Sequence, residues 1–135
     1  MARRNSSLGF FGLFGRSEDL RLLDRALRGA DLHPALVPEG VKLVIVNLMK
    51  DHWPQAEPPD EAYIAVAGLF GYCVAGPDTF ALANGAEALA EAERRIEAAL
   101  ERTESLDAQL VLLALHAGLI SPQVVDRFGL SAEEE

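Results

Sequence analysis

The stretch from Ala62 to Gly76 constrains the fold more than any other part of the chain. It carries no charged residue, Asp60 and Glu61 stand directly before it, and Pro77 follows it. It is shorter than the roughly 20 apolar residues that a membrane span needs, and longer than an ordinary β-strand. A helix of this length is common. Asp60 is a suitable N-cap, and the Gly-Pro pair is a typical helix stop.

A helix that is apolar on nearly every side is expected to be buried on nearly every side. We therefore predict an all-α, single-domain bundle of five or six helices around a buried central helix at about residues 61–75. Gly68 and Gly71 lie on this helix, where small residues let neighbouring helices approach closely. The alternative is that these glycines line a slot for a ligand.

Length and composition indicate one globular domain. The chain has 135 residues, of which 50% are hydrophobic and 24% charged, a composition typical of folded rather than disordered chains. Cys73 is the single cysteine, which excludes an internal disulfide and a zinc site built on several thiolates. Because it lies in the apolar stretch, we predict a buried, unreactive thiol.

The net charge of −9 is unevenly distributed along the chain. Residues 1–28 carry a net charge of +3, and the remainder carries −12. Since affinity for nucleic acid depends mainly on neutralising phosphates, the acidic body argues against a nucleic-acid partner. Ten arginines against two lysines suggest a bacterial gene rich in G and C.

Residues 1–16 are predicted to form a basic, aromatic arm before a helical domain at 17–130 and an acidic tail at 131–135. No small-residue cleavage site follows the apolar run, so we expect no cleaved secretory signal and a cytoplasmic protein. The arm either tucks its phenylalanines into the body or touches an anionic membrane surface. The arm residues expected to make these contacts are Arg3, Arg4, Phe10, Phe11, Phe14 and Arg16.

A first helix is predicted to begin at Ser17 and to stop at Gly29. Leucines at 20, 23 and 27 share one face. The opposite face carries a basic stripe of Arg21, Arg25 and Arg28. Such a stripe is either a solvated surface or a site for an acidic partner.

Further helices are predicted at 39–52, 86–102, 106–116 and 122–128. Ser105 and Ser121 are expected to cap the last two, and Asp78 is expected to cap a short helix that ends at Asn84-Gly85. Residues 41–49 are rich in β-branched side chains, so a strand is the alternative there. In the 39–52 helix, residues 41, 44, 45, 48 and 52 are expected on one face. Residues 89, 92, 96, 99 and 100 of the next long helix are expected to face inward, as are 110, 113 and 117 of the helix after it. Glu91 and Arg95 are expected to pair at i,i+4.

The sequence contains no complete motif for catalysis, metal binding or DNA binding. The segment from Ile120 to Ser131 looks like the first half of a helix-turn-helix motif, but an acidic tail follows it instead of a recognition helix, so DNA binding is disfavoured. No pair among His33, His52 and His116 has the spacing of a helical metal site. There is no phosphate-binding loop or nucleophile elbow, and we predict neither a metal nor a cofactor.

These observations favour a small, non-catalytic interaction or regulatory protein with an unidentified protein partner. One alternative is peripheral membrane attachment through Leu8–Phe14. Another is an enzyme or small-ligand binder whose site lies between the central helix and the helix at 39–52. The residues expected to line that pocket are His52, Trp53, Tyr63 and Tyr72. Self-association is also possible, with the basic arm of one copy on the acidic body of another.

Overall fold

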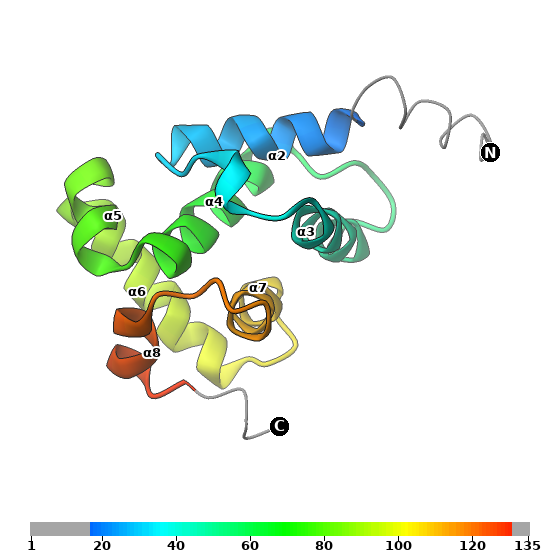
Figure 1. The fold of residues 1–135 in the computed structure, drawn as a ribbon. Helices are drawn as coiled ribbons and strands as arrows, with labels where there is room; N and C mark the ends of the chain where they lie inside the picture. The colour runs from blue at the N-terminus through cyan, green and yellow to red at the C-terminus, as the bar shows by residue number, and fades with distance from the viewer. Residues whose placement is uncertain (1–16, 131–135) are drawn as a thin grey trace.

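The computed structural model describes residues 17–130, and this part of the chain is helical without any β-strand (Figure 1). The prediction of an all-α bundle is therefore confirmed, and residues 41–49 are helical rather than extended. The elements, in order, are α2 (Glu18–Gly29), the 3-10 turn η1 (Pro34–Leu36), α3 (Glu39–His52), α4 (Asp60–Ala75), α5 (Pro77–Asn84), α6 (Ala86–Glu101), α7 (Leu106–His116) and α8 (Pro122–Phe128).

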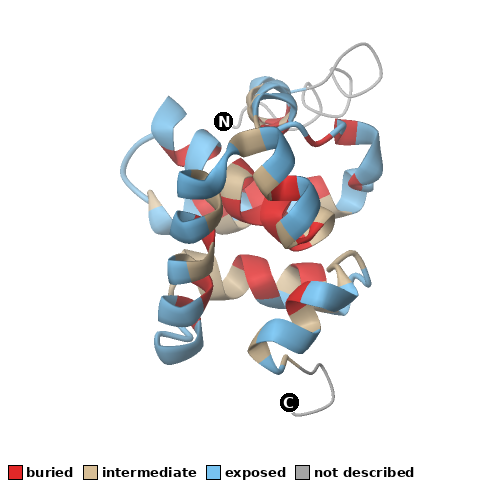
Figure 2. Cartoon of the chain, turned by 90° about the vertical axis from the view of Figure 1, so that its left-hand side faces the viewer, coloured by how far each residue is buried: buried red, intermediate tan, exposed pale blue. Residues whose placement is uncertain are grey.

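The apolar helix α4 is the element around which the others pack. It contacts α2, α5, α6 and α7, while α3 packs against α2 and α7. In Figure 1, α2, α3 and α4 occupy the upper part of the molecule, and α6, α7 and α8 lie below. Buried residues concentrate where these helices face one another, and the outer surfaces are exposed (Figure 2).

The burial of α4 is less complete than its sequence predicts. Val66, Leu69 and Phe70 are inaccessible to solvent or nearly so. Ile64, however, is 64% exposed, and Ala65 beside it is also exposed. The expectation of burial on nearly every side is therefore wrong for the N-terminal half of the helix, because no described element covers this strip.

A tyrosine near the start of α4 connects three helices through one carboxylate. The hydroxyl of Tyr63 donates to Oδ1 of Asp19 on α2 at 3.0 Å. The ammonium of Lys50 on α3 lies 2.7 Å from the other carboxylate oxygen. The buried phenol thus has the hydrogen-bond partner that an enclosed tyrosine requires.

A second tyrosine repeats this arrangement near the end of α4. The hydroxyl of Tyr72 donates to Oε2 of Glu93 on α6 at 3.1 Å. Arg127 of α8 approaches the same carboxylate, with Nε 2.8 Å from Oε2. The ring of Tyr72 packs edge-on against Phe80 of α5, with centroids 5.7 Å apart.

The buried face of α3 differs from the predicted one. Ile45 is buried as expected, but Val44 and His52 are exposed, and the side chains that enter the core are those of residues 42, 45, 46 and 49. The reason is Lys42, which is only 4% exposed and whose ammonium lies 3.1 Å from the Asp24 carboxylate on α2. A buried cation is tolerable only with such a partner, and α2 supplies it.

The helix caps were predicted correctly where serine is the capping residue. Ser17, Ser105 and Ser121 each accept a backbone N–H in the first turn of their helix. Asp60 and Asp78 are not N-caps, which corrects the prediction. Pro59 and Gly76 occupy those positions, and the two aspartates lie in the first turn, where their charge still favours the helix dipole.

Two glycines form the corners between α4, α5 and α6. Gly76 has φ 89° and ψ 165°, and Gly85 has φ 98° and ψ 163°, a region almost restricted to glycine. The α4–α5 corner is also held from outside, because the N–H of Ser121 donates to the carbonyl of Cys73 at 2.7 Å. The predicted break at Asn84-Gly85 is confirmed.

The two helices after this corner run as predicted, with small rotations of their inner faces. In α6, the side chains of residues 92, 96 and 99 are buried, but Leu100 is exposed rather than inward-facing. In α7, the buried residues are Leu110, Val111 and Ala114, whereas Ala117 is exposed. Both helices are apolar over a wide arc, so periodicity alone could not select the face.

Candidate functional site

An apolar groove of about 490 Å³ lies between α2, α4, α5 and the start of α6. This volume is within the range of sites that hold a small ligand or several side chains. The groove is lined by Leu22, Arg25, Ala26, Gly29, Ala30, Asp60, Tyr63, Ile64, Gly68, Phe80, Asn84 and Ala88.

The groove exists because small residues stand where large ones would fill it. Along α2, the leucines at 23 and 27 are buried in the core, and Ala26 and Gly29 lie beside them on the groove side. On α4, Gly68 follows the exposed Ile64 by one turn. Neither glycine would bring an added Cβ into a close contact. The space is therefore open rather than packed.

The two glycines of α4 meet different surroundings. A Cβ added at Gly71 would lie 3.5 Å from the Cβ of Ala30 and 3.8 Å from the ring of Phe80. Gly71 therefore sits at a packed helix contact, as expected for close approach. At Gly68, the nearest atom to an added Cβ is Nη1 of Arg95, at 4.0 Å. Gly68 therefore borders the groove and makes no close helix contact, so the expectation of close packing is confirmed for Gly71 and not for Gly68.

Two of the polar groups that line the groove, the Asn84 amide and the Tyr63 hydroxyl, are engaged within the protein. The side-chain amide of Asn84 donates to the carbonyls of Ala30 and Phe80, at 3.1 and 3.3 Å. The Tyr63 hydroxyl donates to Asp19, and burial together with that hydrogen bond raises the pKa of Tyr63 well above its ordinary value. The phenol therefore remains protonated and cannot serve as a base near neutral pH. The inner surface is suited to apolar contact rather than to proton transfer.

Of the four residues predicted to line a pocket, only Tyr63 borders this groove. His52 is exposed, and its Nε2 lies 2.9 Å from Oε1 of Gln109. Trp53 is partly buried against the core, and Tyr72 is completely enclosed. The groove lies beside α2, whereas the sequence placed a site beside α3. The signal that could have located it is the row of small residues on the outer side of α2.

The predicted contact residues divide between the described and the undescribed parts of the chain. Arg3, Arg4, Phe10, Phe11, Phe14 and Arg16 lie outside the described residues. The basic stripe of Arg21, Arg25 and Arg28 is exposed along α2, and Arg25 borders the groove. Arg21 approaches Glu18 only at 4.0 Å, with both side chains largely in solvent, a pairing that neutralises little of the stripe.

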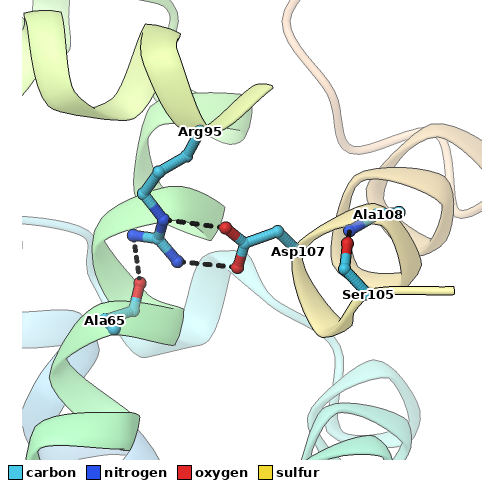
Figure 3. Close-up of polar contacts among 5 residues, drawn as sticks. All are labelled: Ala65, Arg95, Ser105, Asp107 and Ala108. Carbon is cyan, nitrogen blue, oxygen red and sulfur yellow. Dashed lines mark hydrogen bonds and ion pairs between the residues drawn. The ribbon is translucent and has the colours of Figure 1, made fainter. Parts of the chain in front are cut away.

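Arg95 forms a clamp beside the groove (Figure 3). Its guanidinium donates to both carboxylate oxygens of Asp107 on α7, at 2.9 and 2.8 Å, and to the carbonyl of Ala65 on α4, at 2.8 Å. The predicted pairing of Glu91 with Arg95 is therefore wrong, because Glu91 pairs with Arg94 instead. The two parallel hydrogen bonds between Arg95 and Asp107 are stronger than a single ion pair between neighbours on the same helix.

A second, smaller hollow of about 250 Å³ lies between α6, α7 and the last described residues. Leu100, Leu112 and Leu130 contribute to its lining. It contains no charged side chain from the described part of the chain, and it is about half the volume of the groove. The groove is therefore the stronger candidate site.

Other kinds of site find little support in residues 17–130. No three His, Cys, Asp or Glu side chains are grouped there so as to hold a metal ion. Across the same residues, no helix combines the length and the apolar character that crossing a membrane requires. Cys73 is 1% exposed, and burial raises the pKa of its thiol to about 12, in agreement with the predicted inert thiol.

When the chain was compared with known proteins, no protein-family model, no curated protein and no solved structure matched it. The groove and its surroundings are therefore interpreted from their own chemistry.

Proposed function

We propose that the protein is a non-catalytic interaction protein whose groove binds an amphipathic helical segment of a partner protein. The observation that carries this proposal is the exposed Ile64 at the edge of an apolar groove about 490 Å³ in volume. Ile64 is 64% exposed on a helix that is otherwise the centre of the core. Covering its side chain would contribute roughly 1–2 kcal/mol to binding.

The dimensions of the groove suit a short helix. Its lining on α2 runs from Leu22 to Ala30, which corresponds to about 12 Å along the helix axis. Anchors at positions i, i+3, i+4 and i+7 of a partner helix extend over about 10 Å. Helix-in-groove recognition places such anchors against small residues such as Ala26 and Gly68.

The basic stripe along α2 favours acidic partner residues on that side of the groove, whereas Asp60 lines the α4 side. Arg25 borders the groove, and Arg21 and Arg28 are exposed one turn on either side of it. Acidic residues flanking the apolar anchors would meet this stripe, and attraction between exposed charges would mainly raise the association rate. The polar side-chain atoms of Asn84 and Tyr63, which line the groove, are already hydrogen-bonded, which supports binding rather than catalysis.

Photo-crosslinking in cells of the native host tests the proposal. A photoreactive amino acid is placed at Ile64, and a matched control places it at Leu43, which is 48% exposed on α3 away from the groove. We expect a specific adduct from position 64 that maps to an amphipathic segment with acidic flanks. Equal adducts at both positions, or a mapped segment without apolar anchors, would refute the proposal.

A charge reversal in the identified complex provides the second measurement. Arg25→Glu is expected to weaken binding of that segment at low salt, and the weakening should diminish at high salt because screening removes contributions from exposed charges. An Arg102→Glu variant is the control, because Arg102 is an exposed arginine that does not border the groove. If both variants lose the same affinity, the basic stripe has no specific role.

A further inference from the structure

The N-terminal arm is attached next to the groove. The described chain begins at Ser17, which is the N-cap of α2, and α2 together with its C-cap Ala30 contributes five groove residues, from Leu22 to Ala30. The sixteen residues before Ser17 include the apolar run Leu8–Phe14. A segment rich in phenylalanine is therefore tethered to the helix that forms one wall of an apolar groove.

We infer that the segment Leu8–Phe14 of the same chain occupies the groove when no partner is bound. This inference rests on the proposed function because both use the same surface, and it adds a regulatory step to it. The arm and the partner therefore compete for the groove: the arm covers Ile64 in the free protein, and an acidic partner helix displaces it on binding.

The reach of the arm matches the position of the groove. Along α2, the groove residues lie about 8 to 20 Å from Ser17. Phe14 and Leu8 precede Ser17 by three and nine residues, which allows a reach of up to about 10 Å and about 30 Å, respectively. A chain that reverses at residue 16 can therefore place the apolar run alongside the groove.

The chemistry of the arm makes it a weak competitor. Its phenylalanines can fill the apolar lining, and each aromatic ring that is buried removes a large area from water. Its charged residues are Arg3, Arg4 and Arg16, which have the same sign as Arg25 on the α2 side of the groove and the opposite sign to Asp60 on the α4 side. An acidic partner segment gains from that arginine what the arm cannot gain, so the partner can displace the arm.

Tethering compensates for the weak affinity. A segment that is tethered to its site through a few residues has an effective concentration of about 1 mM there. A segment with an intrinsic dissociation constant of about 0.1 mM would then fill roughly nine-tenths of the grooves and weaken partner binding about tenfold. Loss of the apolar anchors of the arm should therefore strengthen binding of the partner segment by about that factor.

Cysteine crosslinking of the purified full-length protein tests the inference without any partner. Gly12→Cys is combined with Gly29→Cys, because the position of Gly29 in the groove has open space for a side chain. The control combines Gly12→Cys with Leu43→Cys on α3. Cys73 stays in both proteins because it is buried and unreactive. Circular dichroism verifies that both fold.

A short bis-maleimide reagent is applied at low protein concentration, and the products are mapped by mass spectrometry. We expect G12C/G29C to crosslink within one chain at least about tenfold faster than G12C/L43C. Adding F10S, F11S and F14S to G12C/G29C should remove the difference. Equal rates in the two pairs would overturn the inference, as would crosslinks that form only between chains. A failed inference leaves the partner adduct at Ile64 unaffected, so the two proposals are tested separately.

Discussion

The Arg95 clamp makes a sharp prediction about stability. Arg95→Met removes the guanidinium and keeps a long side chain on α6, so the two charge-assisted bonds to Asp107 and the bond to the Ala65 carbonyl are lost. Hydrogen bonds to charged groups contribute about 1.5–3 kcal/mol when they are shielded from water. The Arg95 and Asp107 side chains are 21% and 29% exposed, so water replaces part of the loss. We expect the variant to lose about 2 kcal/mol of unfolding free energy.

Arg94→Met is a matched control on the same helix. Arg94 pairs with Glu91, but these side chains are 65% and 59% exposed, and exposed pairs contribute little. We expect this variant to lose less than about 0.5 kcal/mol. The substitution and the change in helix propensity are the same in both variants, so the difference between them reports the clamp.

Urea unfolding monitored by circular dichroism measures both variants. With an m value of about 2 kcal/mol/M, the midpoint should fall by about 1 M for Arg95→Met and by less than about 0.25 M for Arg94→Met. A double-mutant cycle with Asp107→Asn should give a coupling energy of about 1–2 kcal/mol. Equal losses in the two arginine variants, or a coupling energy near zero, would refute the reasoning.

Three further predictions concern the corners, the buried cation and the thiol. Gly76→Ala and Gly85→Ala should each lower the free energy of unfolding by about 1–3 kcal/mol through backbone strain. The loss should be larger for Gly76→Ala because its Cβ would lie 2.8 Å from Ser121 Oγ. Similar losses for the two variants in urea unfolding would contradict this. Lys42→Met should destabilise by about 3 kcal/mol because it removes the buried ammonium that lies 3.1 Å from the Asp24 carboxylate, and adding Asp24→Leu should recover part of the loss in the same assay. Burial raises the pKa of the Cys73 thiol to about 12. Just above pH about 9, the thiol is therefore deprotonated in the unfolded state and still protonated in the folded state. The free energy of unfolding should fall there by up to about 1.4 kcal/mol per pH unit. Cys73→Ala should remove more than about half of that slope between pH about 9 and 10. The rest comes from Tyr63 and Tyr72, because burial raises the pKa of both phenols as well. An unchanged slope would refute the assignment.

Local signals in the sequence predicted the helices well because each signal acts within a few residues. Ser17, Ser105 and Ser121 cap helices as expected, since a capping hydroxyl needs only the N–H groups of the next turn. The Gly76-Pro77 stop and the break at Gly85 depend on backbone geometry that glycine and proline impose by themselves. These features are present before any tertiary contact forms.

Periodicity predicted the buried face less well where a polar side chain entered the core. The burial of Lys42 depends on Asp24, which lies on a different helix. Similarly, Arg95 does not pair with Glu91, because its guanidinium donates to both carboxylate oxygens of Asp107 on α7. Neither pairing has a signature in local sequence, because the partners meet only after the helices dock.

The sequence could not predict the candidate groove either, because the groove also depends on contacts between separate helices. Gly68 and Gly71 look equivalent in the sequence, but one contacts Ala30 closely and the other borders open space. The difference arises because Ala30 and Phe80, which come from other parts of the chain, pack against Gly71 and not against Gly68. The four residues expected to form a pocket are apolar or aromatic in character, and three of them serve the core, its edge or a surface hydrogen bond instead.

The sequence by itself determined the all-α class, the position of each helix and the central place of the apolar helix α4. These follow from hydrophobic content, capping residues and chain-breaking residues, whose effects are local and additive. Only the tertiary structure decided which charged side chains are buried, which glycine is packed, and where Ile64 remains uncovered beside a groove. Those outcomes depend on side chains from separate helices competing for the same space and the same partners, and that competition is resolved only when all the helices have assembled.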